Sequence, residues 1–440
     1  MLRLAGSGAQ ASSQRRGRAG LAAAAGALGP GGGATSSRPP PGWARAPAGA
    51  SLAACGGRCQ GRRFGAAAAA RLPRVPLLEP GCARPWLLQR SGRELARDVA
   101  VRGGLSLEGG SVSQRFVMRW QERPLTVLLV ARHEKRQSLR TVQEMGAWIA
   151  ARGMTVVLEP KLLEEWPVVT GSIHGLRTFS DKEALLNSID LVVTIGGDGT
   201  LTWAASLFEG PMPPVLSFAA GSLGFLTPFP LEKWKQTLSW IFEAVAPDGA
   251  PVPLVCRMRL RVRVRRGPNG HDDREAEQDL SRAEFSCLNE MLVHRGRSNM
   301  LAKLDVRVDG ERVTLVQGDG IILATPTGST AYSLACGGSM VHPAVPGMLL
   351  TPVAPHSLSF RPALLPDSAE VIVIVPLSAR AGVNMSLDGK DICGLQVGDS
   401  VLVTTSSHPV PAICRETDSK DWFASVNQAL QWNRRIEQKS

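Results

Sequence analysis

The sequence predicts an α/β domain followed by a mostly antiparallel β domain, both preceded by a leader of unusual composition. Three observations predict this order. Short apolar runs alternate with helix-like stretches between residues 124 and 250, which is the pattern of a parallel sheet covered by helices. Alternating strands then fill most of residues 251–440. Residues 1–78 contain 11 Arg but no Asp, Glu or Lys, and this composition cannot form a large core.

The leader, residues 1–123, carries the positive charge of the chain. It holds 19 Arg and 5 acidic residues, whereas residues 124–440 hold 31 basic and 33 acidic residues, so the body is nearly neutral. We therefore expect no nucleic-acid partner. A disordered, Arg-rich, acid-free segment is typical of an organelle transit peptide, which predicts a chloroplast or mitochondrion, and a disordered tail on a cytoplasmic protein is the alternative. No apolar run approaches the roughly 20 residues that span a bilayer, so we expect no membrane insertion.

The α/β domain is expected over residues 124–250. Apolar residues at helical spacing predict a helix over 138–151, ended by Gly153, and a shorter helix over 181–188. A third helix-like stretch, LTWAASLF, occupies 201–208. Buried strands are predicted at 125–131, 154–158, 191–195 and 215–218.

The β domain is expected over residues 251–440. Residues 254–265 read LVCRMRLRVRVR, in which every second residue from Arg257 is Arg, and this alternation predicts one half-buried strand with an exposed cationic face. Asp309-Gly310 predicts a hairpin turn, and a last helix is predicted over 421–436. Further strands are predicted at 285–294, 303–308, 312–317, 320–324, 371–376, 383–387 and 400–405.

Cysteine and histidine spacing does not match a metal site. The chain has eight Cys without a C-x-x-C pair and seven His without an H-x-x-x-H pair. We therefore expect neither a disulfide framework nor a metal site built by the protein.

The strongest local motif is GGDGT at 196–200, between the strand at 191–195 and the helix-like stretch. Its three glycines allow backbone N–H groups to approach a ligand, and the N-terminus of a helix favours anions such as a phosphate chain. The turn also contains a carboxylate, Asp198, which predicts a general base or a Mg²⁺ partner in phosphoryl transfer. The structural alternative is that Asp198 caps the helix.

Two weaker signals flank other strands. GSLGFL at 221–226 follows the strand at 215–218 and by itself reads as an ordinary loop. Asn289 and Glu290 interrupt an apolar strand, so they need partners or a ligand unless that face of the strand is solvated.

TPTGSTAY at 325–332 clusters small hydroxyl residues around Pro and Gly. Ser329 or Thr330 could cap a following helix. The segment ends in the only tyrosine of the chain, Tyr332, whose phenol could stack on or hydrogen-bond a base. The structural alternative is a turn with a core tyrosine.

Taken in this order, the motifs resemble those of the ATP-dependent NAD kinase family, and most of all its eukaryotic branch. GGDGT alone is shared with lipid kinases and phosphofructokinases, whereas TPTGSTAY with an upstream Asn-Glu pair is highly specific. The resemblance covers residues 124–436. The matching segments are GGDGT at 196–200, SLGFLTPF at 222–229, LNE at 288–290, QGDGIILATPTGSTAYS at 317–333, GGSMVHP at 337–343 and HSLSFRP at 356–362.

The resemblance implies a Rossmann-like α/β domain and a C-terminal β-sandwich. It implies transfer of the γ-phosphoryl group of ATP, with Mg²⁺, to the 2′-hydroxyl of the adenosine ribose of NAD, with Asp198 as the base. ATP and NAD are the implied partners, and relatives commonly form dimers or tetramers. At Ala219-Ala220 and at Leu334-Ala335 the sequence differs from the family pattern. These differences affect the expected shape of the pocket and its contacts with the nicotinamide, and not the expected reaction. The residues implied to bind the nucleotides are Gly196, Gly197, Gly199, Thr200, Phe225, Asn289, Glu290, Asp319, Thr327, Thr330, Ala331 and Tyr332.

Two other functions compete with this interpretation. A lipid kinase would share the glycine turn, but it needs an apolar groove for acyl chains and gives no reason for Asn289, Glu290 and TPTGSTAY. A dinucleotide-binding regulator would use the same pocket without turnover, and an intact Asp198 argues against it.

Overall fold

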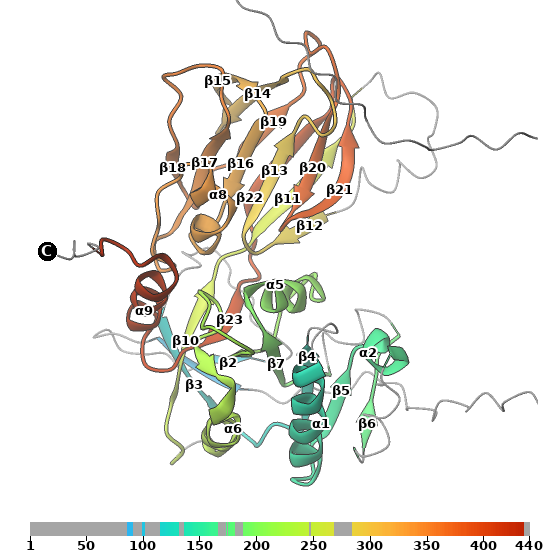
Figure 1. The fold of residues 1–440 in the computed structure, drawn as a ribbon, viewed down its shortest axis with the longest axis vertical. Coiled ribbons are helices and arrows are strands. Elements are labelled where there is room, and N and C mark those ends of the chain that lie inside the picture. The colour runs from blue at the N-terminus through green and yellow to red at the C-terminus, as the bar shows by residue number, and fades with distance from the viewer. Residues whose placement is uncertain are drawn as a thin grey trace, which may run out of the picture. The chain divides into compact units, whose positions relative to one another are not determined.

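The computed structural model describes residues 86–90, 99–101, 115–131, 136–165, 173, 175–180, 188–245, 248–267 and 284–434. These residues form one mixed sheet with helices on its faces and two antiparallel sheets that pack together (Figure 1). An α/β layer and a β-sandwich are the two parts that the sequence and the resemblance predict, so the fold class is confirmed.

The first sheet has a parallel half and an antiparallel half. Its strands are β1 (Trp86–Arg90), β2 (Val99–Val101), β3 (Arg115–Trp120), β4 (Thr126–Ala131), β5 (Thr155–Leu158), β6 (Leu176–Arg177), β7 (Leu191–Gly196), β8 (Val215–Ala219), β9 (Phe229–Pro230), β10 (Val252–Arg257) and β23 (Val410–Ile413). They lie in the order β2-β1-β3-β10-β23-β8-β7-β4-β5-β6, with β9 beside β8. Strands β4 to β9 pair in parallel and β23 joins β8 in parallel, whereas β23, β10, β3, β1 and β2 pair antiparallel.

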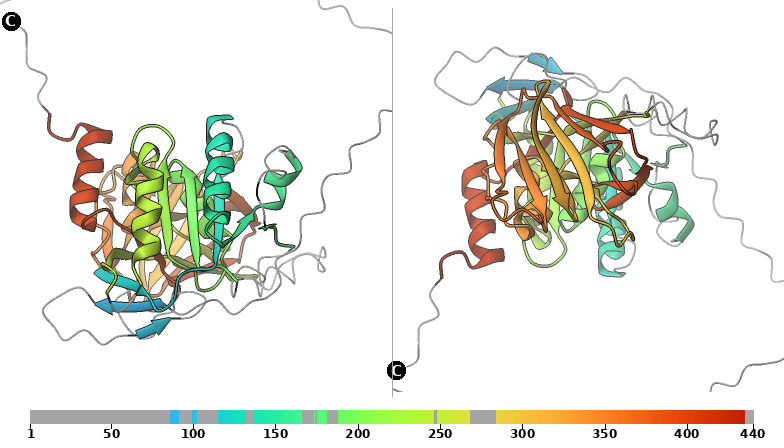
Figure 2. Two further views of the ribbon diagram at one scale, coloured as in Figure 1. Left: turned by 90° about the horizontal axis from the view of Figure 1, so that it is seen from below. Right: turned by 90° about the horizontal axis from the view of Figure 1, so that it is seen from above.

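The parallel strands are buried on both faces, as expected where helices cover a sheet on both sides. Along β4, Val127 and Leu129 face one apolar core, and Leu128 and Val130 face the other. The first face is covered by α1 (Arg136–Ala150) and α6 (Trp234–Glu243), which lie in front of the strands in Figure 2, left. The second face is covered by α5 (Asp198–Ser206). Two short helices, α2 (Pro160–Glu165) and η1 (Leu231–Lys233), complete this part.

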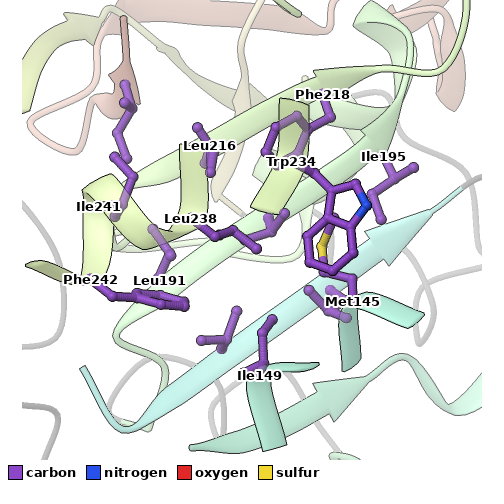
Figure 3. Close-up of a cluster of buried hydrophobic side chains, with 14 of the residues drawn as sticks. Met145, Ile149, Leu191, Ile195, Leu216, Phe218, Trp234, Leu238, Ile241 and Phe242 are labelled. Carbon is purple, nitrogen blue, oxygen red and sulfur yellow. The ribbon is translucent and has the colours of Figure 1, made fainter. Parts of the chain in front are cut away.

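The core under α1 and α6 fixes the strand that leads to the GGDGT turn (Figure 3). Met145 of α1 and Leu238 of α6 are fully buried, as are Leu191 and Ile195 of β7. Burying an aliphatic side chain contributes about 1.5–3 kcal/mol. The end of β7, where the motif begins, is therefore held by a well-packed layer.

The second and third sheets pack face to face as a sandwich. The strands are β11 (Leu260–Arg265), β12 (Glu284–Cys287), β13 (Glu290–His294), β14 (Ala302–Val308), β15 (Glu311–Gly318), β16 (Gly320–Ala324), β17 (Gly347–Val353), β18 (Ala363–Pro366), β19 (Val371–Ile374), β20 (Val383–Leu387), β21 (Lys390–Leu395) and β22 (Ser400–Thr405). One sheet has the order β12-β11-β22-β19-β14-β15 and the other β18-β17-β16-β13-β20-β21. Val262 and Val264 of the first and Met291 and Val293 of the second are fully buried in a common core.

The chain passes from one sandwich sheet to the other six times, and two of these crossings are short corners that carry predicted site residues. One corner, Leu288-Asn289, separates β12 from β13, and the other, Asp319, separates β15 from β16. The turn after β16 contains η2 (Thr327–Thr330) and α8 (Tyr332–Ala335), and the last described helix is α9 (Asp418–Leu430). Polar residues singled out in the sequence therefore lie at places where strands end.

Most strands and helices lie where the sequence predicts them, with three corrections. The predicted strand 285–294 is interrupted at Leu288-Asn289. The folded body was expected to begin near Pro124, but β1, β2 and β3 of the preceding leader join the first sheet, and Met118 and Trp120 of β3 are fully buried. Residues 181–187 of the predicted short helix lie outside the described residues.

The third correction concerns the arginine-rich segment 254–265, predicted as one strand with a cationic outer face. It forms two strands in different sheets, β10 and β11, and Arg259 between them is buried rather than exposed. The Arg259 guanidinium donates to the carbonyl oxygens of Phe208 at 2.7 Å, Gly210 at 2.6 Å and His408 at 2.5 Å. Burial lowers the pKa of Arg259 to about 10, which leaves it charged at neutral pH. Local alternation could not show that the segment changes sheets.

Candidate active site

Asp198 opens helix α5 directly after strand β7. Gly197 is the N-cap residue and Asp198 makes no capping hydrogen bond, so the structural alternative that Asp198 caps its helix is wrong. A Cβ at Gly196 would collide with the side chain of Thr200, which explains the glycine at that position. Gly199 is exposed, and the N-terminus of α5 offers the positive end of a helix dipole to an anion.

The Asp198 carboxylate is held by the loop that follows β8. The backbone N–H of Phe225 donates to Oδ2 at 3.0 Å, the N–H of Leu226 donates to Oδ1 at 2.9 Å, and the Thr227 hydroxyl lies 3.4 Å from Oδ1. Gly224 lies so close that a Cβ there would meet the carboxylate. The GSLGFL segment is thus not an ordinary loop, because it fixes the orientation of the acid and leaves lone pairs for a ligand.

Asn289 and Glu290 lie at the first sandwich corner, where Asp388 organises the backbone. The Asp388 carboxylate accepts N–H bonds from Leu288 at 2.9 Å, Asn289 at 2.7 Å and Glu290 at 3.2 Å. Burial raises the pKa of Asp388, and these three bonds counteract that effect. Asp388 was not among the predicted site residues. The sequence does contain a local pattern that could have drawn attention to Asp388. Asp388-Gly389 lies between two strands and is the same dipeptide that predicts the hairpin at Asp309.

Both Asp-Gly turns have the left-handed backbone that such hairpins require. The φ angles are 52° at Asp309 and 48° at Asp388, followed by 85° at Gly310 and 76° at Gly389. The predicted hairpin at Asp309 is confirmed, since β14 and β15 pair directly across it.

Glu290 is a buried carboxyl group with an unused acceptor. Only 7% of the residue is exposed, and its Oε2 has no hydrogen-bond partner among the described residues. Burial, and then the negative charge of Asp388, raises the pKa of Glu290 to about 7, although a bond to the Tyr332 backbone opposes the rise. Because a buried polar atom needs a partner, this oxygen suits a ligand hydroxyl or amide.

The TPTGSTAY turn packs directly against this corner. The Thr325 hydroxyl donates to the Leu288 carbonyl at 2.6 Å, and the Thr325 N–H donates to the Asn289 carbonyl at 2.9 Å. A Cβ at Gly328 would collide with the same Asn289 carbonyl, so glycine permits the close approach. The turn and the Asn-Glu pair therefore form one unit.

The hydroxyl groups of the TPTGSTAY turn contact protein groups and do not cap the next helix. Thr327 is buried and lies 3.4 Å from a guanidinium nitrogen of Arg257, and the Thr330 hydroxyl donates to the Thr327 carbonyl at 3.2 Å. The N-cap of α8 is Ala331 without a side-chain bond, so neither Ser329 nor Thr330 caps that helix.

Tyr332 is not a core residue, because 42% of it is exposed. Partial burial raises the pKa of its phenol, and Cys336 and Asp319 add to the rise. Asp319, at the second sandwich corner, pairs with Arg295 at 2.6 Å. Arg295 was not among the predicted site residues, because nothing in the sequence around it indicates that it pairs with Asp319.

The structure gathers the predicted residues into two groups that border one apolar cluster. The first group is the GGDGT turn with the loop at 224–227, and the second is Asn289, Glu290, Asp319 and the 325–332 turn. Leu201 of α5, Leu288 and the partly buried Phe225 belong to the same cluster. The described residues hold no group of three or more His, Cys, Asp or Glu arranged for a metal ion. No helix in the described ranges is long and apolar enough to cross a membrane.

Comparisons with known proteins show which family the chain is similar to. Residues 127–245 match the family model of the ATP-NAD kinase N-terminal domain, and residues 288–414 match that of the ATP-NAD kinase C-terminal domain. The chain is 39% identical over 344 residues to "Probable NAD kinase 1" of Oryza sativa subsp. japonica, covering 76% of this chain and 62% of that protein. It is 38% identical over 362 residues to "NAD kinase 2, chloroplastic" of Arabidopsis thaliana, covering 81% of this chain and 35% of that protein.

A solved structure shows the same fold. The crystal structure of yeast NADH kinase complexed with NADH superposes with a TM-score of 0.65 at 28% identity, covering 76% of this chain and 94% of the yeast chain. The chain spans less than two thirds of the length of both plant relatives.

Proposed function

This chain belongs to the ATP-NAD kinase family, and we propose that it transfers the γ-phosphoryl group of ATP to the 2′-hydroxyl of the adenosine ribose of NAD, forming NADP and ADP. The observation that carries the proposal is the Asp198 carboxylate, held by two backbone N–H groups at the start of α5. A phosphate chain is favoured at that helix N-terminus, and the dinucleotide is favoured at the corner formed by Asn289, Glu290 and the 325–332 turn.

In the proposed reaction, Asp198 orients the 2′-hydroxyl and accepts its proton. The hydroxyl oxygen forms a bond to the γ-phosphorus, and the bond from that phosphorus to the β,γ-bridging oxygen breaks, which releases ADP. A carboxylate is a weak base for an alcohol, so the proton leaves late and orientation supplies most of the effect. The bonds from Phe225 and Leu226 fix that orientation.

Mg²⁺ would enter with ATP. A hard cation that keeps several waters and binds substrate phosphates needs few protein ligands, which fits a site whose described residues hold no cluster of metal-binding side chains. Asp198 is the carboxylate of the anion-binding turn itself and would hold the ion or one of its waters. The ion would neutralise charge that develops on the phosphoryl group.

The test is Asp198→Asn in an assay of NADP formation. Asn has a single acceptor oxygen and can keep one of the two backbone N–H bonds that the carboxylate accepts, so the fold should persist, while kcat should fall by roughly 100-fold or more. Asp309→Asn is the matched control, because Asn tolerates the left-handed hairpin position and can keep the bond from the Glu370 N–H.

Near-normal turnover by the Asp198→Asn protein would show that Asp198 is not the base. The same assay should offer a sphingoid base and a diacylglycerol as acceptors. Consumption of ATP with a lipid but not with NAD would favour the lipid-kinase alternative, and binding of NAD without turnover by the wild-type chain would favour a regulator.

We also propose that the protein forms a homo-oligomer and that its leader directs it to an organelle. The resemblance of the motifs to the NAD kinase family supports the first of these proposals. The composition of residues 1–78 supports targeting, and one plant relative is named as chloroplastic. Light scattering on the purified chain would give the mass of the particle and so test the first proposal.

A further inference from the structure

The C-terminal helix α9 contacts the loop that holds Asp198 (dark red in Figure 1). The Ser425 hydroxyl lies 3.0 Å from the Gly224 carbonyl oxygen and 2.9 Å from the Asp421 carbonyl oxygen of the preceding turn. Ser425 is 6% exposed, so this contact is shielded from water. A residue 201 positions away from Gly224 thus helps to fix its backbone.

Only two further hydrogen bonds separate that contact from the candidate base. The Gly224 N–H donates to the Thr227 hydroxyl oxygen at 3.1 Å, and the Thr227 hydroxyl lies 3.4 Å from the Asp198 carboxylate. The next residue, Phe225, donates its N–H to the same carboxylate. A shift of the Gly224 backbone would therefore move the donors that orient Asp198.

The first turns of α9 contact the other half of the site. The Ser419 hydroxyl lies 3.1 Å from Nε2 of His342, and the Trp422 ring packs edge-on against the imidazole with 5.2 Å between centroids. The neighbouring residue, Val341, exchanges two hydrogen bonds with the Ser329 hydroxyl of the TPTGSTAY turn, at 2.9 and 3.1 Å. The helix thus reaches the TPTGSTAY turn through a single intermediate segment.

The helix itself is firmly anchored. Thr417 caps it by accepting the Lys420 N–H at 3.2 Å. Asp421 accepts from the N–H and the Nε of Arg415, at 2.8 and 3.0 Å, and Val426 is fully buried. Because the helix has its own cap and its own buried face, it can keep a fixed distance between its contact with Gly224 and its contact with His342.

We propose that α9 holds the Asp198 loop and the TPTGSTAY turn in register, and that Ser425 is a positioning residue for phosphoryl transfer. The inference rests on the proposed function, because Asp198 is the group whose orientation it explains. Ser425 acts through Gly224 and touches no substrate. Its loss should lower the rate of the chemical step while leaving the affinity for NAD nearly unchanged.

The experiment compares Ser425→Ala, Ser425→Thr and the control Asn427→Ala, which changes an exposed position of the same helix. Removing the hydroxyl should lower kcat by about three- to ten-fold, because small misplacements of a reacting group have large effects on rate. The KM for NAD should stay within about two-fold. Ser425→Thr, which keeps the hydroxyl, should restore most of the rate, and Asn427→Ala should match wild type.

Two readouts separate positioning from general loss of structure. The kcat is expressed per NAD-binding site, counted by calorimetric titration, so that a smaller folded fraction does not imitate a slower step. Hydrogen exchange at the Phe225 and Leu226 amides is measured without substrate, and it should quicken in Ser425→Ala but not in Asn427→Ala.

Wild-type kcat per site and unchanged amide exchange in Ser425→Ala would overturn the proposal. A rate that falls only in proportion to the number of binding sites would also overturn it, since this shows a purely structural role. If the wild-type chain does not phosphorylate NAD, the proposed function fails, and the amide exchange alone still decides whether α9 holds the loop.

Discussion

Replacing Glu290 with Gln should stabilise the ligand-free protein at alkaline pH. Glu290 is buried, one of its oxygens has no partner among the described residues, and its pKa is raised to about 7. A carboxyl group that binds its proton more tightly in the folded than in the unfolded chain makes stability fall as pH rises. The loss begins near the ordinary pKa of 4.5 and is complete above the folded-state pKa of about 7.

The size of the effect follows from the rise in pKa. At roughly 1.4 kcal/mol for each pH unit, a rise from 4.5 to about 7 corresponds to about 3 kcal/mol of lost stability. Gln has no charge to bury, so Glu290→Gln should unfold with a free energy about 3 kcal/mol higher than wild type at pH 8. The two proteins should differ little at pH 5, where the wild-type carboxyl group is largely protonated.

Urea unfolding at pH 5 and pH 8 measures this difference. Tryptophan fluorescence reports the transition, since Trp120 and Trp234 are buried in the first core. Glu284→Gln is the control, because Glu284 is exposed and pairs with Arg263 at the surface, where such pairs contribute little. An equal difference at both pH values, or a Glu290→Gln protein that is less stable at pH 8, would refute the reasoning. Stabilisation would show that this acid is kept at the expense of stability, as expected of a ligand contact.

Three further outcomes are expected. Arg259→Met should lower the free energy of unfolding by about 3 kcal/mol in urea titrations, because one buried and two partly buried carbonyl groups lose their donor at about 1–3 kcal/mol each. Gly328→Ala should cost about 1–3 kcal/mol in thermal unfolding and weaken NAD binding in a calorimetric titration, because its Cβ would collide with the Asn289 carbonyl. A fluorescent reporter fused behind residues 1–123 should collect in an organelle when imaged in cells.

Each of these three predictions would be contradicted by a specific result. Arg263→Met should change stability by no more than about 0.5 kcal/mol, and an Arg259→Met protein equally unaffected would show that the buried cation is dispensable. A Gly328→Ala protein that binds NAD like wild type would separate the turn from the ligand. A diffuse cytosolic reporter would contradict targeting.

Local patterns in the sequence predicted much of the fold because they report burial. The strands at 125–131, 191–195 and 215–218 were readable as apolar runs, since parallel strands covered on both faces admit few polar residues. Alternation failed at Arg259, because periodicity describes one strand at a time and cannot show that a segment leaves one sheet for another. Strands β17, β18 and β23 and helix α6 are among the elements that were not predicted.

The candidate site was predicted in part for the same reason. Asp198 and the TPTGSTAY turn have glycine and hydroxyl residues adjacent in sequence, so they stand out locally. Asp388 acts on residues about 100 positions away, and Ser425 on Gly224, 201 positions away. Such pairs exist only after folding, and no local spacing encodes them.

Strand β23 has a consequence for how the chain is synthesised. It lies between β8 and β10 in the sheet. It is nevertheless synthesised nearly 200 residues after β8 and more than 150 residues after β10. Until residue 413 has left the ribosome, the edge of β10 and the start of the β8 edge, which β9 does not cover, lack this partner, and open edges invite wrong pairing. Assembly of this protein should therefore be slow and late, and a chaperone that shields those edges during translation should raise the yield of folded chain.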